Sequence, residues 1–228
     1  MELGSTGVAL ALNLINIGYV AWVLGASDAT RRWRLPVALV MLAWLGGLHV
    51  GLSGQALFPA AISGPAFLAV IVAGVGAVAA LLFLTPVRGL MRALSLVQLQ
   101  LLQGIRVWFG TAFLVWAVLG VLPAMFGVVD GVTHVGAGFF GLMAAFSCAA
   151  GATAQARVWF ATLFGLVDIL TVASTLALVL LPQIGVHHPM MYAVFLPAPL
   201  WLCLHLVSID RLLRGAVGEA SPRSVHAS

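Results

Sequence analysis

Lysine is absent from this sequence, and charged residues of any kind are scarce. Ten arginines and six acidic residues make up 7% of the 228 residues, whereas about 25% of a soluble domain is charged. A soluble fold could not cover its surface with so few charges. The absence of lysine also excludes a retinal Schiff base, and therefore a light-driven rhodopsin, because that linkage needs a lysine amine.

Cysteine and the common catalytic motifs are also nearly missing. The two cysteines, Cys148 and Cys203, lie in apolar stretches and do not indicate a disulfide framework. The sequence has no GxxxxGK[ST], HExxH or GxSxG motif and no cysteine pair with zinc-site spacing. These absences favour a protein that is not an enzyme.

Long apolar runs dominate what remains, since 63% of the residues are hydrophobic. A helix needs about 20 apolar residues to cross the hydrocarbon core of a bilayer. Seven stretches meet this need: 7–25, 35–57, 66–86, 98–121, 132–150, 158–181 and 190–210. The sequence therefore predicts an all-α integral membrane protein, a seven-transmembrane-helix bundle within residues 1–214 that contacts the lipid bilayer. Residues 215–228 are predicted to form a disordered cytoplasmic tail.

Arginines occur in alternate loops of this predicted topology. They fall between spans one and two, three and four, and five and six, and after span seven. Loops that carry arginine stay in the cytoplasm, so the N-terminus is predicted outside and the C-terminus inside. The first span lacks the basic flank of a signal peptide and is expected to remain uncleaved. Because topology explains the positive charge, we expect no nucleic-acid partner.

The source membrane is inferred from two further features. The loops are short, and arginine replaces lysine throughout. Both features favour the inner (plasma) membrane of a bacterium.

Polar and small residues within the spans recur at helical spacing and mark faces that point into the bundle. Span six has Thr162, Gly165, Asp168, Thr171 and Thr175 in one stripe. Span five has a face of small residues around His134 that is typical of close helix packing. The inward faces of the other spans contribute Asn13, Asn16, His49, Gln103, Arg106 and His205. We expect all these faces to converge on one interior.

Two charged residues of this interior are predicted to pair. Arg106 lies ~12 Å and Asp168 ~15 Å from the cytoplasmic ends of their spans, at the helical rise per residue. An unpaired charge at such a depth costs several kcal/mol, so we predict an Arg106–Asp168 ion pair with Gln103 satisfying part of its hydrogen-bonding capacity. The pair has two interpretations, a structural clamp between spans four and six or a titrating gate.

Two prolines, Pro197 and Pro199, interrupt the last predicted span. Proline has no backbone N–H, so we expect a kink that leaves a carbonyl near Phe195 in need of another donor.

Histidine and methionine residues predicted near the outer side suggest a metal site. His134, His187 and His188, together with His49, Met190 and Met191, combine imidazole and thioether ligands that suit copper. Haem would require His49 and His134 at one depth on facing helices. Adjacent histidines in a loop are commonly solvated surface residues, so the simplest expectation is that no cofactor is bound.

Three functions are compatible with these features. The first is a transporter or channel for a small solute or protons, with Asp168 titrating, Arg106 as its counter-charge, and a path lined by Asn13, Asn16, His49 and Gln103. The second is a metal or haem protein of the outer leaflet. The third is a non-catalytic subunit or assembly factor whose small-residue faces bind another membrane protein or a second copy of the chain.

Overall fold

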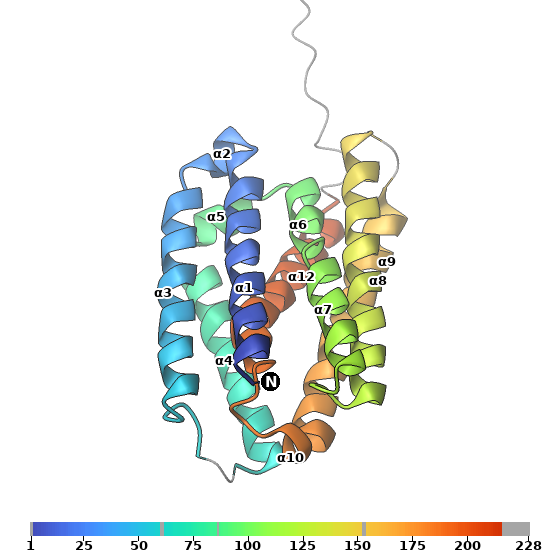
Figure 1. The fold of residues 1–228 in the computed structure, drawn as a ribbon. Coiled ribbons are helices and arrows are strands. Elements are labelled where there is room, and N and C mark those ends of the chain that lie inside the picture. Colours follow the sequence, from blue (N-terminus) through green and yellow to red (C-terminus); the bar gives the residue numbers. More distant parts are fainter. Residues whose placement is uncertain (1, 60–61, 86, 152–153, 216–228) are drawn as a thin grey trace, which may run out of the picture.

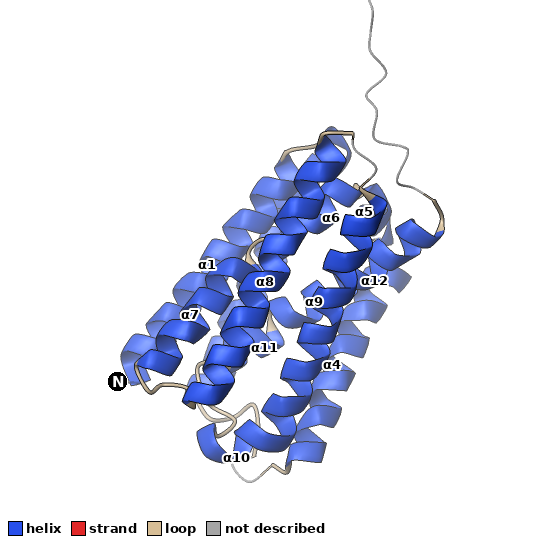
Figure 2. Ribbon diagram, turned by 90° about the vertical axis from the view of Figure 1, so that its right-hand side faces the viewer, coloured by secondary structure: helices blue, strands red, loops and turns tan. Residues whose placement is uncertain are grey.

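The computed structural model describes residues 2–59, 62–85, 87–151 and 154–215. Within these ranges every regular element is a helix and none is a strand. The helices run along a common direction in one bundle (Figures 1 and 2). The all-helical prediction is therefore confirmed. Most of the predicted tail, 216–228, lies outside the described residues.

Six helical segments of the described chain are long and apolar enough to cross a membrane. They are Gly4–Gly25, Arg34–Ser53, Gly64–Leu84, Leu96–Val118, Ala124–Ala149 and Gln155–Ile184. Their boundaries follow the predicted apolar runs, with one clear difference. The fifth segment begins at Ala124 rather than 132, because the helix starts directly after Pro123. A proline before the first helical residue fixes the backbone where a helix begins, and it needs no N–H there.

These segments correspond to individual helices of Figure 1. The first three are α1 (Glu2–Gly25), α3 (Arg34–Ser53) and α4 (Gly64–Leu84), with the short α2 (Asp28–Arg31) between α1 and α3. The fourth consists of α6 (Leu96–Gln103) and α7 (Arg106–Val118), preceded by the short α5 (Arg88–Ala93). The fifth is α8 (Ala124–Ala149). The sixth is α9 (Gln155–Thr175), a π-helical turn (Leu176–Leu180) and α10 (Leu181–Ile184).

The last predicted span, 190–210, is not one continuous helix. It is divided at Leu196 into α11 (Met191–Phe195) and α12 (Pro197–Leu213), and α12 has only 17 residues. The missing N–H groups of the two prolines explain the break. The freed carbonyl oxygen of Phe195 accepts a hydrogen bond from Trp44 Nε1 in α3 at 2.8 Å. The predicted kink is thus present, and the side chain of Trp44 in another helix satisfies the carbonyl oxygen that it frees.

The helices form two groups, which contact each other through α1 and α6. α8 packs against α6, α7 and α9, while α1 packs against α3. α12 contacts α4 as well as α6 and α9, and it crosses between the two groups in Figure 1. Arg31, Arg88, Arg157 and Arg211 all belong to connections or helix termini at the same end of the bundle, which we term the arginine end. The N-terminus and α10 lie at the opposite end (Figure 1).

Glycines bring α7 and α8 into backbone contact. A Cβ atom on Gly110 would lie 2.5 Å from the Gly131 carbonyl oxygen, and one on Gly138 would lie 2.7 Å from the Val107 nitrogen. No real side chain fits at such distances. The predicted small-residue face of the fifth span therefore packs directly on the fourth.

Replacing Gly110 by alanine is expected to destabilise the bundle. Its new methyl group would meet backbone atoms of α8, which cannot move unless the two helices separate. Overpacking of this kind costs about 1–3 kcal/mol. The matched control is Gly74→Ala in α4, where a Cβ meets nothing within 4 Å and alanine favours the helix. Thermal unfolding in detergent, followed by circular dichroism, should show a lower Tm for Gly110→Ala alone. Equal Tm values for the two variants would contradict the close contact.

Candidate functional site

An ion pair lies where α7, α9 and α12 meet. Arg106 is the first residue of α7, and its Nη2 donates to Oδ2 of Asp168 in α9. The side chains are 0% and 2% exposed. The pair predicted from the depths of the two residues is therefore confirmed. Because both side chains are buried, each charge depends on the other for stabilisation.

The second Arg106 nitrogen, Nη1, contacts two further groups. It donates to the Gly165 carbonyl oxygen and to His205 Nε2, both at 3.2 Å. Arginine can only donate, so His205 Nε2 must accept and the ring proton of a neutral His205 must be on Nδ1. The guanidinium carbon also lies 5.3 Å from the centre of the Trp201 ring, within cation–π range. Four residues of α9 and α12, namely Gly165, Asp168, Trp201 and His205, thus fix the position of one side chain.

Gln103 does not have its predicted role. Its Nε2 donates to the Trp201 carbonyl oxygen at 3.5 Å, and Gly165 and His205 satisfy Arg106 instead. Gln103 precedes Arg106 by almost one helical turn and therefore lies nearer the arginine end. Its amide contacts α12 rather than the ion pair.

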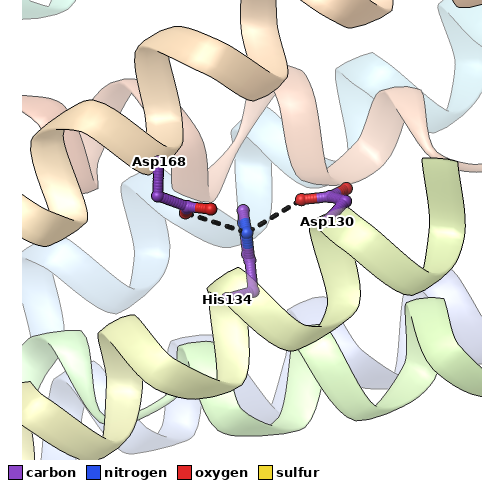
Figure 3. A group of neighbouring side chains, drawn as sticks. All are labelled: Asp130, His134 and Asp168. Carbon is purple, nitrogen blue, oxygen red and sulfur yellow. Dashed lines mark ion pairs between the residues drawn. The ribbon is translucent and has the colours of Figure 1, made fainter.

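A second carboxylate and a histidine complete the cluster. Asp130 and His134 are one turn apart in α8, and both are buried. His134 Nδ1 lies 2.9 Å from Asp130 Oδ1 and 3.0 Å from Asp168 Oδ2, so one nitrogen stands between two carboxylates (Figure 3). Neither contact has the angle of a hydrogen bond, and a single N–H can serve only one of the two oxygens at a time. We call Arg106, Asp130, His134, Asp168 and His205 the charged cluster.

A glycine makes room for the charged cluster. A Cβ on Gly165 would lie 2.6 Å from His205 Nε2 and 3.0 Å from Arg106 Nη1. Glycine at this position therefore lets both side chains approach the α9 backbone. On the other side, the rings of Phe113 and Trp201 flank His134, with centroids 5.6 and 5.8 Å away. Glycine and aromatic residues together enclose the charges in an environment of low polarity.

Two cavities reach the charged cluster from different sides. One, of about 400 Å³, lies between α4, α9 and α12, and we call it the apolar cavity. It is lined by Leu68, Ile71, Phe113, Ile169, Trp201 and, as its one ionisable residue, His134. The other, of about 420 Å³, lies between α8 and α9, and we call it the threonine cavity. Its walls include Asp130, Thr133, Asp168, Thr171, Thr175 and Gln183. Part of the predicted polar stripe of the sixth span therefore lines a cavity.

A buried polar network extends from the cluster towards the arginine end. Gln100 Nε2 donates to Thr162 Oγ1 at 3.2 Å and to Ser208 Oγ at 3.3 Å. Ser208 lies in α12 almost one turn beyond His205, and Thr162 lies in α9 almost one turn before Gly165. Buried polar side chains thus extend from the charged cluster towards the arginine end.

The remaining predicted path residues lie elsewhere in the interior. Asn13 and Asn16 in α1 are completely buried; Asn13 donates to Ala9 O at 2.8 Å, and the Asn16 amide has no hydrogen-bond partner among the described residues. His49 Nδ1 lies 2.7 Å from Tyr192 Oη, which joins α3 to α11. Among the described residues, none of these three forms a hydrogen bond or ion pair with the charged cluster, so the structure does not bring them together with Arg106 and Asp168.

The metal site predicted from His134, His187 and His188 is not assembled. His188 Nε2 contacts the Val121 carbonyl oxygen at 3.0 Å, and its Nδ1 accepts from the Met190 amide at 3.1 Å. Met190 and Met191 are packed in the apolar core. His134 faces α9 instead of this loop, because Asp130 and Asp168 attract its ring. Over the described residues, the group of side chains that could hold a metal ion is Asp130, His134 and Asp168, whose ligand atoms all lie within 4.8 Å of one another.

Asp130 is the site residue that the sequence interpretation missed. With the fifth span placed at 132–150, Asp130 fell in an outer loop. The signal that could have found it was the glycine spacing, because Gly127 and Gly131 continue the small-residue face of His134 towards the N-terminus. A helix that includes these glycines also includes Asp130, four residues before His134.

Comparison with known proteins gives one match. A family described as a domain of unknown function (DUF8737) matches residues 64–213. No curated protein and no solved structure matches the chain. The family match covers about two thirds of the 228 residues and contains every member of the charged cluster. The protein therefore belongs to the DUF8737 family.

Proposed function

We propose that the protein is a small transporter that couples the movement of a small solute to a proton held by Asp130, His134 and Asp168. The observation that carries this proposal is the composition of the charged cluster. Two buried carboxylates face one buried guanidinium, and a histidine stands between the carboxylates. Such groups inside a membrane commonly mark proton and substrate pathways.

The charge balance of the cluster favours one bound proton. With both histidines neutral, two carboxylates and one guanidinium leave a net charge of −1. A net charge in a medium of low polarity costs several kcal/mol, so the cluster gains from one additional positive charge. A proton on His134 supplies it at a ring that lies beside both carboxylates. Release of that proton restores the unfavourable charge, which links proton exchange to any rearrangement of α8 and α9.

The two cavities suggest how proton and solute reach the cluster. The threonine cavity extends from Gln183, near the end of the bundle opposite the arginines, to Asp168. The apolar cavity reaches His134 and has an almost entirely apolar lining. A pocket of this kind suits a small, mainly apolar molecule with one polar group that contacts the histidine. The solute and the proton would then compete or cooperate at one imidazole.

We also propose seven spans, with the N-terminus outside and the C-terminus inside the plasma membrane of a bacterium. In this topology α11 and α12 together form the seventh span, interrupted at Leu196. Arginines at one end of the bundle support the orientation, because positively charged loops remain on the cytoplasmic side.

Cysteine labelling tests this topology. Single cysteines at Ala56 and Gln183 are expected to react with a membrane-impermeant maleimide on intact cells, whereas cysteines at Ala29 and Gly215 should react only after permeabilisation. All four positions are exposed, and the background carries Cys148→Ala and Cys203→Ala. Labelling of Gln183→Cys and Gly215→Cys from the same side would contradict a seventh span.

Proton coupling is tested with proteoliposomes that contain a pH-sensitive dye. A panel of small, mainly apolar solutes is applied, each as an inward gradient. With at least one of them, the wild-type protein should change the pH of the lumen. Asp130→Asn should abolish this flux, because it removes one carboxylate of the proton site and leaves the Arg106–Asp168 pair intact. We expect a loss of at least about 100-fold, the range typical of a proton-transferring group.

The matched control is Asp210→Asn, an exposed carboxylate that pairs with Arg214 at the end of α12. It should leave the flux unchanged. The proposal would be contradicted if the proton flux persisted in Asp130→Asn. It would also be contradicted if no solute of the panel produced a proton flux in the wild-type protein.

A divalent cation at Asp130, His134 and Asp168 is the second candidate, since the three ligand atoms lie within 4.8 Å of one another. The charge balance disfavours it, because two positive charges would change the cluster from −1 to +1. Elemental mass spectrometry of protein purified from native membranes should therefore find well under one metal ion per chain. About one zinc, copper or iron per chain, lost in His134→Ala and retained in His188→Ala, would show that these three residues bind a metal ion instead of a proton.

A further inference from the structure

A third cavity lies at the arginine end, far along the helices from the charged cluster. It has a volume of about 600 Å³ and lies between the last turn of α4, the short helix α5 and the end of α12. Four of its lining residues are arginines: Arg88, Arg92, Arg211 and Arg214. Arg106 is not among them, so this cavity is a separate feature.

The positive charges of this cavity are poorly compensated. Its one carboxylate, Asp210, is bound by Arg214, with Oδ1 2.8 Å from Nη2 and 2.9 Å from Nε. Arg211 Nη2 donates to the Arg92 carbonyl oxygen, which fixes the end of α12 against α5. In the part of the chain that the structure describes, Arg88, Arg92 and Arg211 have no ion pair with a carboxylate. Within the described ranges, three guanidinium groups at the cavity therefore lack a paired carboxylate.

The rest of the cavity and its margins are apolar. Phe83, Met91 and Val207 line it alongside the arginines. Leu84 at the end of α4 and Leu213 at the end of α12 are 83% and 73% exposed. Both helices end at this level, so the arginines lie where an apolar helix surface meets the polar region of a bilayer.

We propose that this cavity binds the headgroup of an anionic phospholipid. Arg88, Arg92 and Arg211 would hold the phosphate, because guanidinium groups form paired hydrogen bonds with phosphate oxygens. The acyl chains would cover Leu84 and Leu213. Basic pockets between helices at a membrane surface are suited to such headgroups.

A lipid fits these observations better than a free phosphate. A soluble anion would use the three arginines but would leave the apolar wall and the exposed leucines uncovered. An amphiphile satisfies the charged and apolar parts of the site together. The proposal does not depend on proton coupling, since the cavity shares no residue with the charged cluster.

Native mass spectrometry tests the site. The purified full-length protein in detergent is titrated with equal amounts of phosphatidylglycerol and phosphatidylcholine at physiological ionic strength. We expect the anionic lipid to be retained preferentially. Arg88→Gln combined with Arg92→Gln should weaken that binding about 25-fold, since each arginine near an anionic lipid contributes about a factor of five. The backbone carbonyl that binds Arg211 remains in this variant.

The control variant combines Arg31→Gln with Arg32→Gln at the same end of the bundle. Arg31 is exposed and pairs with Asp28, and Arg32 lies over the Trp33 ring, so neither lines the cavity. This variant should retain the lipid. Equal losses in both variants, or equal retention of the two lipids by the wild type, would overturn the site. Displacement of the lipid by millimolar inorganic phosphate would show a soluble-anion site instead.

Discussion

A guanidinium group with no exposed surface needs a carboxylate beside it, and in this bundle that requirement determines how several helices meet. Arg106 is reached by Asp168 from α9 and by His205 from α12. Removing one partner of such a buried pair typically costs about 3–5 kcal/mol. The close approach of α7 and α8 then carries Asp130 and His134 to the same point. Gly131 and Gly138 of α8 lie where a Cβ atom would collide with α7, and Gly165 of α9 lies where it would collide with His205 and Arg106.

Much of the architecture follows from local properties of the sequence. Apolar length is a local quantity, so the apolar runs located all six segments able to cross a membrane. Arg106 and Asp168 could be paired from the sequence because each is an isolated charge in an apolar run, and the helical rise gives its depth. Pro197 and Pro199 predicted the break before α12. That Trp44 would donate to the freed carbonyl was not predictable, since nothing local to either residue records their proximity.

The rest of the site depends on helix rotation and on long-range packing, which the sequence does not encode locally. His134 was assigned to a cluster with His187 and His188 because all three were expected near the outer side. Depth alone could not show that its ring points at α9. Gln103 and His205 both lie on inward faces, but only His205 reaches Arg106, because α12 crosses close to the arginine at that height. Asp130 was missed through an error of one helix boundary.

Trp201 gives the protein an optical property that follows from its surroundings. Its indole is buried between the Arg106 guanidinium and the His134 ring, with Phe109 against it at 5.2 Å. An indole changes its emission with the electric field of a nearby charge, and an adjacent protonated imidazole quenches it. In a chain whose other tryptophans have been replaced, the fluorescence of Trp201 would therefore record in real time whether His134 carries a charge, without any dye or label.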